Sequence, residues 1–161
     1  MNELIKQNDY EGVLRLLNDG VDIETQDNKG NTLLHIAVDC NNIEIVQLLL
    51  ERGANINTQA DRYGWTPLHR ASTGCDIKIL KLIIDHGANI EARTSDGLTP
   101  LHVAAVWDRD KRVRILLEHG ANVNAKDKKN RTPLYSAVMW NSDEQVRILL
   151  EYGATIDIVH L

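Results

Sequence analysis

A period of about 33 residues runs through the 161-residue chain and constrains its fold more than any other feature. A glycine followed by Val-Asp, Ala-Asn or Ala-Thr recurs at Gly20, Gly53, Gly87, Gly120 and Gly153, at spacings of 33, 34, 33 and 33 residues. Repetition at this length indicates a stack of small units, each of which buries its apolar face only against its neighbours.

A second motif recurs in phase with the glycines. It reads Thr-Pro-Leu-His-x-Ala at 66–71 and at 99–104, with Leu33 in place of proline at 32–37 and Tyr135 in place of histidine at 132–137. From this threonine to the next glycine there are always 21 residues. The pattern resembles the ankyrin repeat, which has this period and this motif. The resemblance covers essentially the whole chain and implies stacked helix pairs joined by hairpin fingers.

The residues themselves also predict two short helices in each unit. Pro67, Pro100 and Pro133 suit the first turn of a helix, with the preceding threonine as its cap. A second run is apolar at helical spacing, as in 45–50, and a glycine then ends it. The polar segments that follow, such as 27–30, predict a tight turn. We therefore expect an all-α ankyrin-repeat solenoid with about five units and β-hairpin fingers.

The repeat boundaries divide one expected domain, 1–161, into a capping unit and four repeats. Residues 1–26 lack the threonine motif, contain six acidic and two basic residues, and predict short helices at about 3–6 and 10–17. A short polar first unit is typical of the cap that a stack requires. The repeats are predicted at 27–60, 61–93, 94–126 and 127–159, with 160–161 as a tail.

Composition argues against several classes of protein. The net charge of −5 opposes general binding to nucleic acid or to anionic membranes. There is no signal peptide at the start, and no apolar run approaches the roughly 20 residues that span a bilayer. Two cysteines do not make a disulfide framework. We expect a monomeric intracellular protein, in the cytoplasm or the nucleus, that does not insert into membranes.

No set of residues predicts an enzyme. His35, His69 and His102 occupy the same position of successive repeats, where the resemblance implies a structural bridge between the backbone and the motif threonine. The chain has no phosphate-binding or nucleophile motif, and Cys40 and Cys75 lack the spacing of metal ligands. We expect no catalytic residue, no metal and no cofactor.

The turn between the two helices of each repeat varies in a correlated way. Where its fourth position is isoleucine, its first is cysteine or glycine; where the fourth is Asp110 or Asp143, the first is Trp107 or Trp140. In one interpretation each indole fills the volume of the missing isoleucine while the aspartate helps to cap the second helix. In the other, the tryptophans are exposed contacts for a partner. We expect an intermediate, in which one indole face packs and the other faces the groove.

The finger positions also differ between repeats. Arg62, Tyr63 and Trp65 are of the types that dominate protein hot spots, and Arg70 faces the same groove by resemblance. The other interpretation is a solvated finger on which Tyr63 covers its neighbour. The candidate partner-binding residues are Arg62, Tyr63, Trp65, Arg70, Leu98, Val106, Trp107, Lys128, Lys129, Arg131, Met139 and Trp140.

Together these features predict a non-enzymatic module that binds a partner protein through its concave face and fingers, as the resemblance implies. Two alternatives stay open. One is an inhibitor or immunity-type protein that blocks a partner enzyme. The other is a nucleic-acid or lipid binder that uses the basic residues of the last finger, although a basic cluster of this kind is more often a solvated surface.

Overall fold

The computed structural model describes residues 1–60, 62–106 and 109–156. In these residues the chain forms ten α-helices, and β pairing is limited to two isolated antiparallel bridges, Gln26 with Thr32 and Ala60 with Trp65. The helices are α1 (Asn2–Lys6), α2 (Tyr10–Asn18), α3 (Leu33–Asp39), α4 (Ile43–Glu51), α5 (Pro67–Thr73), α6 (Ile77–Asp85), α7 (Pro100–Ala104), α8 (Asp110–Glu118), α9 (Pro133–Met139) and α10 (Asp143–Glu151). The prediction of an all-α fold is confirmed, and each predicted unit contains one helix pair.

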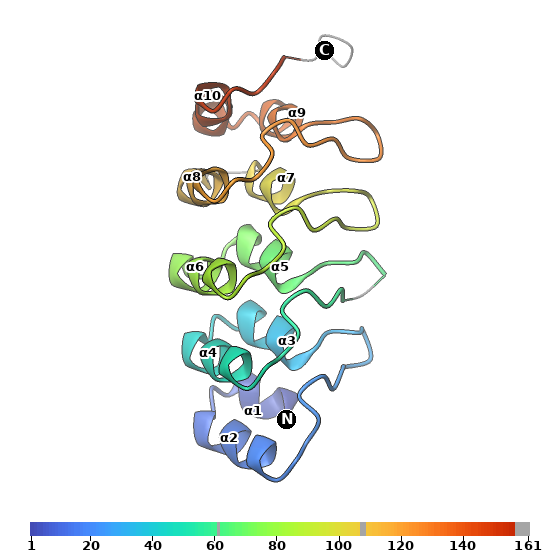
Figure 1. The fold of residues 1–161 in the computed structure, drawn as a ribbon, viewed down its shortest axis with the longest axis vertical. Helices are drawn as coiled ribbons and strands as arrows, with labels where there is room; N and C mark the ends of the chain where they lie inside the picture. Colours follow the sequence, from blue (N-terminus) through green and yellow to red (C-terminus); the bar gives the residue numbers. More distant parts are fainter. Residues whose placement is uncertain (61, 107–108, 157–161) are drawn as a thin grey trace. The chain divides into compact units, whose positions relative to one another are not determined.

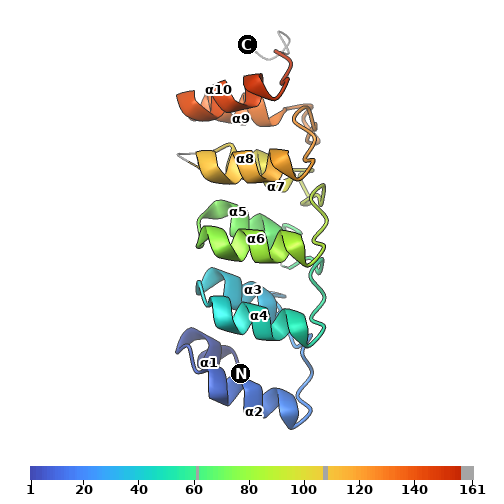
Figure 2. The ribbon, with the colours of Figure 1, turned by 60° about the vertical axis from the view of Figure 1, so that its left-hand side comes forward.

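The contacts divide the chain into two compact units, Met1–Ala88 and Asn89–Leu161, which we describe separately. In the first, the pair α3 and α4 lies between α1 and α2 on one side and α5 and α6 on the other (Figure 1). The finger loops of this unit extend from one edge of the helix pairs (Figure 2). The core of the unit consists of aliphatic side chains from all three pairs, among them Ile5, Val13, Leu33, Leu49, Leu68 and Ile79.

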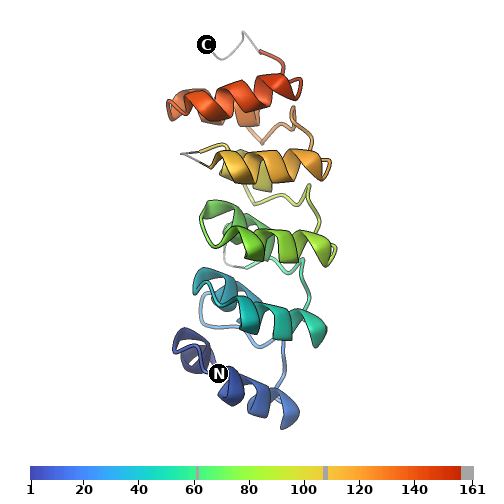
Figure 3. The same cartoon turned by 90° about the vertical axis from the view of Figure 1, so that its left-hand side faces the viewer.

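In the second unit, α7 packs against α9 and α8 packs against α10. The second helices α8 and α10 run side by side in the view of Figure 3. Leu101, Ala104, Val113, Leu116, Ala137 and Ile148 form the core between the two pairs. The prediction that the whole chain forms a single domain stays a prediction.

The predicted helix starts are confirmed. Thr66 and Thr99 are the N-caps of α5 and α7, and each side-chain oxygen accepts a hydrogen bond from the backbone N–H three residues later, with proline in the first turn. The glycines after the second helices all have positive φ, as at Gly53 (84°) and Gly120 (86°), which is the conformation that ends a helix. The local signals of the sequence thus determine both ends of the helix pairs.

The interpretation in which Asp110 and Asp143 help to cap the second helices does not match the cap positions. Asp110 and Asp143 are not caps: α8 and α10 begin at these residues, and the cap positions belong to Arg109 and Ser142, neither of which makes a side-chain capping bond. Acidic side chains in the first turn still favour the helix, because they face the positive end of its dipole. Asp76, by contrast, caps α6 with a hydrogen bond from the N–H of Lys78.

Candidate functional site

The finger of residues 60–65 and the start of α5 bring together four predicted contact residues, which we call the finger surface: Arg62, Tyr63, Trp65 and Arg70. Tyr63 is 48% exposed, and the Arg62 guanidinium lies 4.8 Å from the centre of its ring and donates a hydrogen bond to its hydroxyl oxygen at 2.6 Å. Arg70 lies 5.6 Å from the ring centre of Trp65. Each arginine is therefore paired with an aromatic side chain.

Arg70 also ties this surface to the preceding repeat. Its Nη1 lies 3.5 Å from a carboxylate oxygen of Asp39, at the end of α3, and its Nη2 donates to the side-chain oxygen of Asn31 at 3.1 Å. A shallow groove runs between the two fingers, and its lining includes Lys29, Arg62 and Arg70. The finger surface is thus basic and aromatic, and Arg70 links it to the preceding repeat.

Two histidines of the repeat motif have the structural role that the resemblance implies. Nδ1 of His35 accepts a hydrogen bond from the backbone N–H of Thr32 at 3.3 Å and lies 2.8 Å from the threonine hydroxyl, and its Nε2 lies 3.0 Å from the carbonyl oxygen of Trp65. His102 makes the same contacts with Thr99 and, at 2.9 Å, with the carbonyl oxygen of Arg131. Because Nδ1 accepts from an amide, the proton of the neutral ring belongs on Nε2.

The finger of the last repeat has three predicted basic contact residues, Lys128, Lys129 and Arg131, but one of the three charges is paired within the finger. Lys128 and Lys129 are exposed, but Arg131 donates through Nε to Asp127 at 2.7 Å. Burial alone would raise the pKa of Asp127, but the hydrogen bonds from Arg131 and from the backbone N–H of Lys129 outweigh burial and lower the pKa. Arg131 is therefore held by its own finger, with its guanidinium 5.8 Å from the ring centre of Tyr135.

The remaining predicted contacts lie in the second unit or outside the described residues. Met139 is 60% exposed and Trp140 is 56% exposed, so Trp140 is not a buried substitute for isoleucine. Leu98 and Val106 are half-buried. The prediction for Trp107 falls outside the described residues. The described residues of this group therefore belong to the second unit, whereas the finger surface belongs to the first.

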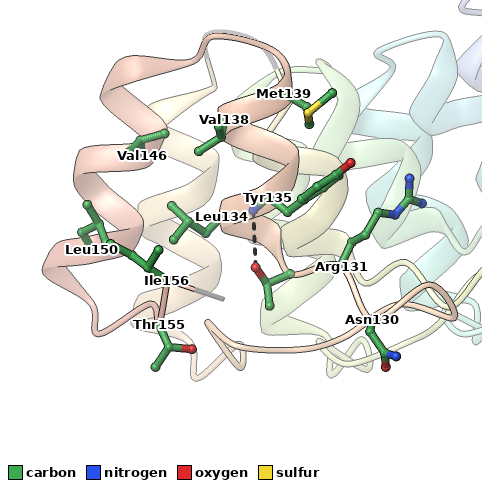
Figure 4. Close-up of a pocket in the computed structure, with 11 residues that line it drawn as sticks. Asn130, Arg131, Leu134, Tyr135, Val138, Met139, Val146, Leu150, Thr155 and Ile156 are labelled. Carbon is green, nitrogen blue, oxygen red and sulfur yellow. Dashed lines mark hydrogen bonds between the residues drawn. The ribbon is translucent and has the colours of Figure 1, made fainter. Parts of the chain in front are cut away.

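The structure also shows an apolar surface that the sequence analysis missed, on α9, α10 and the segment after α10. We call it the end face; its residues are Leu134, Val138, Met139, Val146, Leu150 and Ile156. Their side chains border a pocket of about 170 Å³, with Arg131 and Tyr135 at its edge (Figure 4). A signal for it was present in the sequence, because five of these six residues recur 100 positions earlier, at Leu34, Val38, Val46, Leu50 and Ile56.

Comparison with protein families identifies the chain. The family model described as "Ankyrin repeats (3 copies)" matches residues 2–94 and 76–160. The chain belongs to the ankyrin repeat family. Ankyrin repeats are in general protein–protein interaction modules and typically have no enzymatic activity.

Two curated relatives are ankyrin repeat proteins of fowlpox virus (strain NVSL). One is 42% identical over 55 residues, which is 34% of this chain and 13% of the relative; the other is 44% identical over 46 residues, or 28% of this chain and 9% of the relative. The matches thus span only a small part of the length of these relatives. In the described part of this ankyrin repeat chain, no helix is long and apolar enough to cross a membrane.

Proposed function

We propose that this ankyrin repeat chain is a non-enzymatic module that binds a partner protein through the finger surface, inside the cell. The observation that supports this most is the combination at 62–70 of one half-exposed tyrosine, one half-buried tryptophan and two arginines. Tyrosine, tryptophan and arginine are the residue types most enriched at binding hot spots.

The finger surface is also organised before any partner arrives. Arg62 is held by the ring and hydroxyl of Tyr63, and Arg70 is held by Trp65, Asp39 and Asn31. Ordering flexible arginine side chains costs conformational entropy when a complex forms. Because these contacts already restrict both arginines, less conformational entropy would be lost when a partner binds.

The second unit contributes a further proposed contact region. Met139 and Trp140 present exposed apolar area at the turn before α10, and Lys128 and Lys129 present positive charge at the last finger. Leu98 and Val106, half-buried, belong to the same proposal. Because Arg131 is neutralised by Asp127, the last finger retains two of its three predicted cations, which favours a protein partner over a nucleic acid or an anionic lipid surface.

The test begins with capture of partners from a cell extract by the immobilised chain and their identification by mass spectrometry. The captured protein is then purified, and its affinity for the wild type and for Tyr63→Ala is measured by calorimetry. We expect Tyr63→Ala to weaken binding by about tenfold or more, as for a hot-spot residue. If the partner is an enzyme, its inhibition by the chain distinguishes an inhibitor from a scaffold.

Tyr152→Ala is the matched control. Tyr152 is also a tyrosine, 40% exposed, but it lies at the end of α10, in the second unit. The Tyr152→Ala variant should bind the partner with the same affinity as the wild type. Equal affinities for wild type and Tyr63→Ala, with both proteins folded by circular dichroism, would contradict the proposed surface.

A further inference from the structure

The two fingers of the second unit are tied together along their backbones, and we call residues 93–98 and 126–131 the joined fingers (Figure 1). The backbone N–H of Lys128 donates a hydrogen bond to the carbonyl oxygen of Asp96 at 3.0 Å. The approach is so close that a Cβ on Gly97 would lie 2.9 Å from the nitrogen of Lys128. The position of the last finger is therefore fixed by its neighbour.

Two side chains reinforce this tie. Arg93 donates through Nη1 to the carbonyl oxygen of Lys126 at 2.6 Å, and Nε2 of His102 lies 2.9 Å from the carbonyl oxygen of Arg131. These contacts hold the last finger on both sides of its turn. The turn itself is closed by the carboxylate of Asp127, which accepts two backbone N–H groups. The tip of the finger is thus carried by a backbone that is held at several points.

The joined fingers have a net positive charge in a chain whose total charge is negative. Their residues, all of them described, include five basic and two acidic side chains, a net charge of +3, whereas the whole chain has −5. One of the two acids, Asp127, is already paired with Arg131. Thr94 takes the position of Asp127 in the other finger and holds that turn with a neutral hydroxyl, which accepts the N–H of Leu98 at 3.1 Å. The positive excess therefore follows from how the two turns are built.

Lys128 and Lys129 are exposed at the tip of the last finger. Their backbone N–H groups are bound, but within the described chain their ammonium groups enter no hydrogen bond or ion pair. Asp96 is exposed at the tip of the other finger and forms an ion pair with neither lysine. The joined fingers thus present two cations and one carboxylate on two turns of fixed backbone.

An acidic protein segment complements this surface. Carboxylates of such a segment pair with the ammonium groups, and complementary charge across an interface sets its register and its rate of association. Because the backbone of both turns is held before binding, only the lysine side chains lose conformational freedom. A nucleic acid fits less well, because it is a long polyanion and the rest of this chain, with a net charge of −8, would repel its phosphates.

We propose that the joined fingers bind an acidic segment of the partner protein, whose carboxylates pair with Lys128 and Lys129. This inference rests on the proposed function, because it names the chemistry of one part of the partner. It concerns the second unit, whereas the finger surface belongs to the first, so variants of the two surfaces separate them.

The first experiment uses a fluorescent peptide of alternating glutamate and serine, about twelve residues long, and measures its anisotropy as the whole chain is added at low salt. The wild type should bind the peptide, and added salt should weaken binding. Lys128→Ala combined with Lys129→Ala should weaken binding by about fivefold or more, because two exposed ion pairs are lost. Asp96→Asn should strengthen it by about twofold, since a repulsive carboxylate is removed while the backbone carbonyl that holds Lys128 stays.

Lys78→Ala combined with Lys81→Ala is the matched control, because it removes two exposed lysines from α6 in the first unit. This variant should bind the peptide like the wild type. The proposal would be overturned by a wild type that does not bind the acidic peptide, or by a folded double variant of Lys128 and Lys129 that binds it unchanged. Tighter binding of single-stranded DNA of the same length, or no gain in affinity from Asp96→Asn, would also overturn it.

The purified partner from the capture experiment separates this inference from the proposed function. If Tyr63→Ala weakens binding of that protein and the double variant of Lys128 and Lys129 does not, the finger surface is supported and the acidic segment is overturned. If the double variant weakens binding and Tyr63→Ala does not, the joined fingers are supported and the finger surface is contradicted.

Discussion

Arg131 places both Nε and Nη2 at 2.7 Å from the same carboxylate oxygen of Asp127, four residues earlier on the last finger. The other oxygen of Asp127 accepts the backbone N–H groups of Lys129 and Arg131 at 2.8 and 2.9 Å. One buried carboxylate therefore holds both the turn and the arginine of this finger. The first finger has the same turn but no arginine: Asp27 accepts the N–H groups of Lys29 and Asn31.

This difference predicts unequal effects of removing the two aspartates. Asp127→Ala should lower the free energy of unfolding by about 2–3 kcal/mol, because it removes charge-assisted hydrogen bonds and leaves Arg131 without its partner on the finger. Asp27→Ala should cost about 1 kcal/mol, as for the loss of a local cap. Urea unfolding of both variants measures the difference, and equal losses would show that the ion pair contributes little.

The surroundings of His102 predict a dependence of stability on pH. Burial lowers the pKa of His102 from its usual 6.5, because a charged ring in that site would be desolvated. The unfolded chain then binds a proton more readily than the folded chain does. The contribution of neutral His102 is fully present above pH 6.5 and is lost as the pH falls below that value towards the lower folded pKa.

The measurement is urea unfolding of wild type and His102→Gln at about pH 7.5 and pH 5.5, where a histidine of ordinary pKa changes its charge. Wild type should lose more stability than the variant over this interval. A variant with the full pH dependence of the wild type would assign the effect to other groups.

Two glycines with the same backbone conformation should respond differently to alanine. Gly97 (φ +82°) and Gly120 (φ +86°) are both left-handed, but a Cβ on Gly97 would lie 2.9 Å from the backbone nitrogen of Lys128, whereas one on Gly120 would meet open space. Gly120→Ala should cost about 1 kcal/mol from backbone strain alone. Gly97→Ala should cost more, because the two neighbouring fingers must separate. Thermal melts of the two proteins compare the costs directly.

Trp140 should contribute little to stability. It is 56% exposed, so Trp140→Ala should lower the free energy of unfolding by about 1 kcal/mol or less, in contrast to the 3–5 kcal/mol typical of a buried tryptophan. Subtraction of the variant's fluorescence emission spectrum from that of the wild type should give the emission of a solvent-exposed indole. A large loss of stability would instead restore the packing interpretation.

The local structure of the repeats could be predicted from the sequence because its causes are local. Threonine caps, proline in the first turn and glycine after the second helix act within a few residues, and the 33-residue period shows which segments stack. The predicted helices at 3–6 and 10–17 differ from α1 and α2 by a single residue at one end of each.

The properties of the site depend more on contacts that side chains make only in the folded chain. A count of charges placed Arg131 in a basic cluster. The count does not show that Arg131 pairs with Asp127, because that pairing depends on the shape of the folded turn. One interpretation gave Asp110 and Asp143 a capping role, because a cap and a first-turn residue differ by a single position in the sequence. The end face was overlooked because an apolar pattern in the sequence does not show how exposed its side chains are.

The way the fingers are held has a practical consequence. The turns at Asp27 and Asp127 are fixed by carboxylate bonds to the backbone, and the rings of His35 and His102 reach the backbone carbonyls of Trp65 and Arg131. The side chains of Asn28, Lys29, Lys128 and Lys129 take no part in these bonds and are exposed. These four codons can be randomised together in a display library, and new specificities selected, while the scaffold that presents them stays the same.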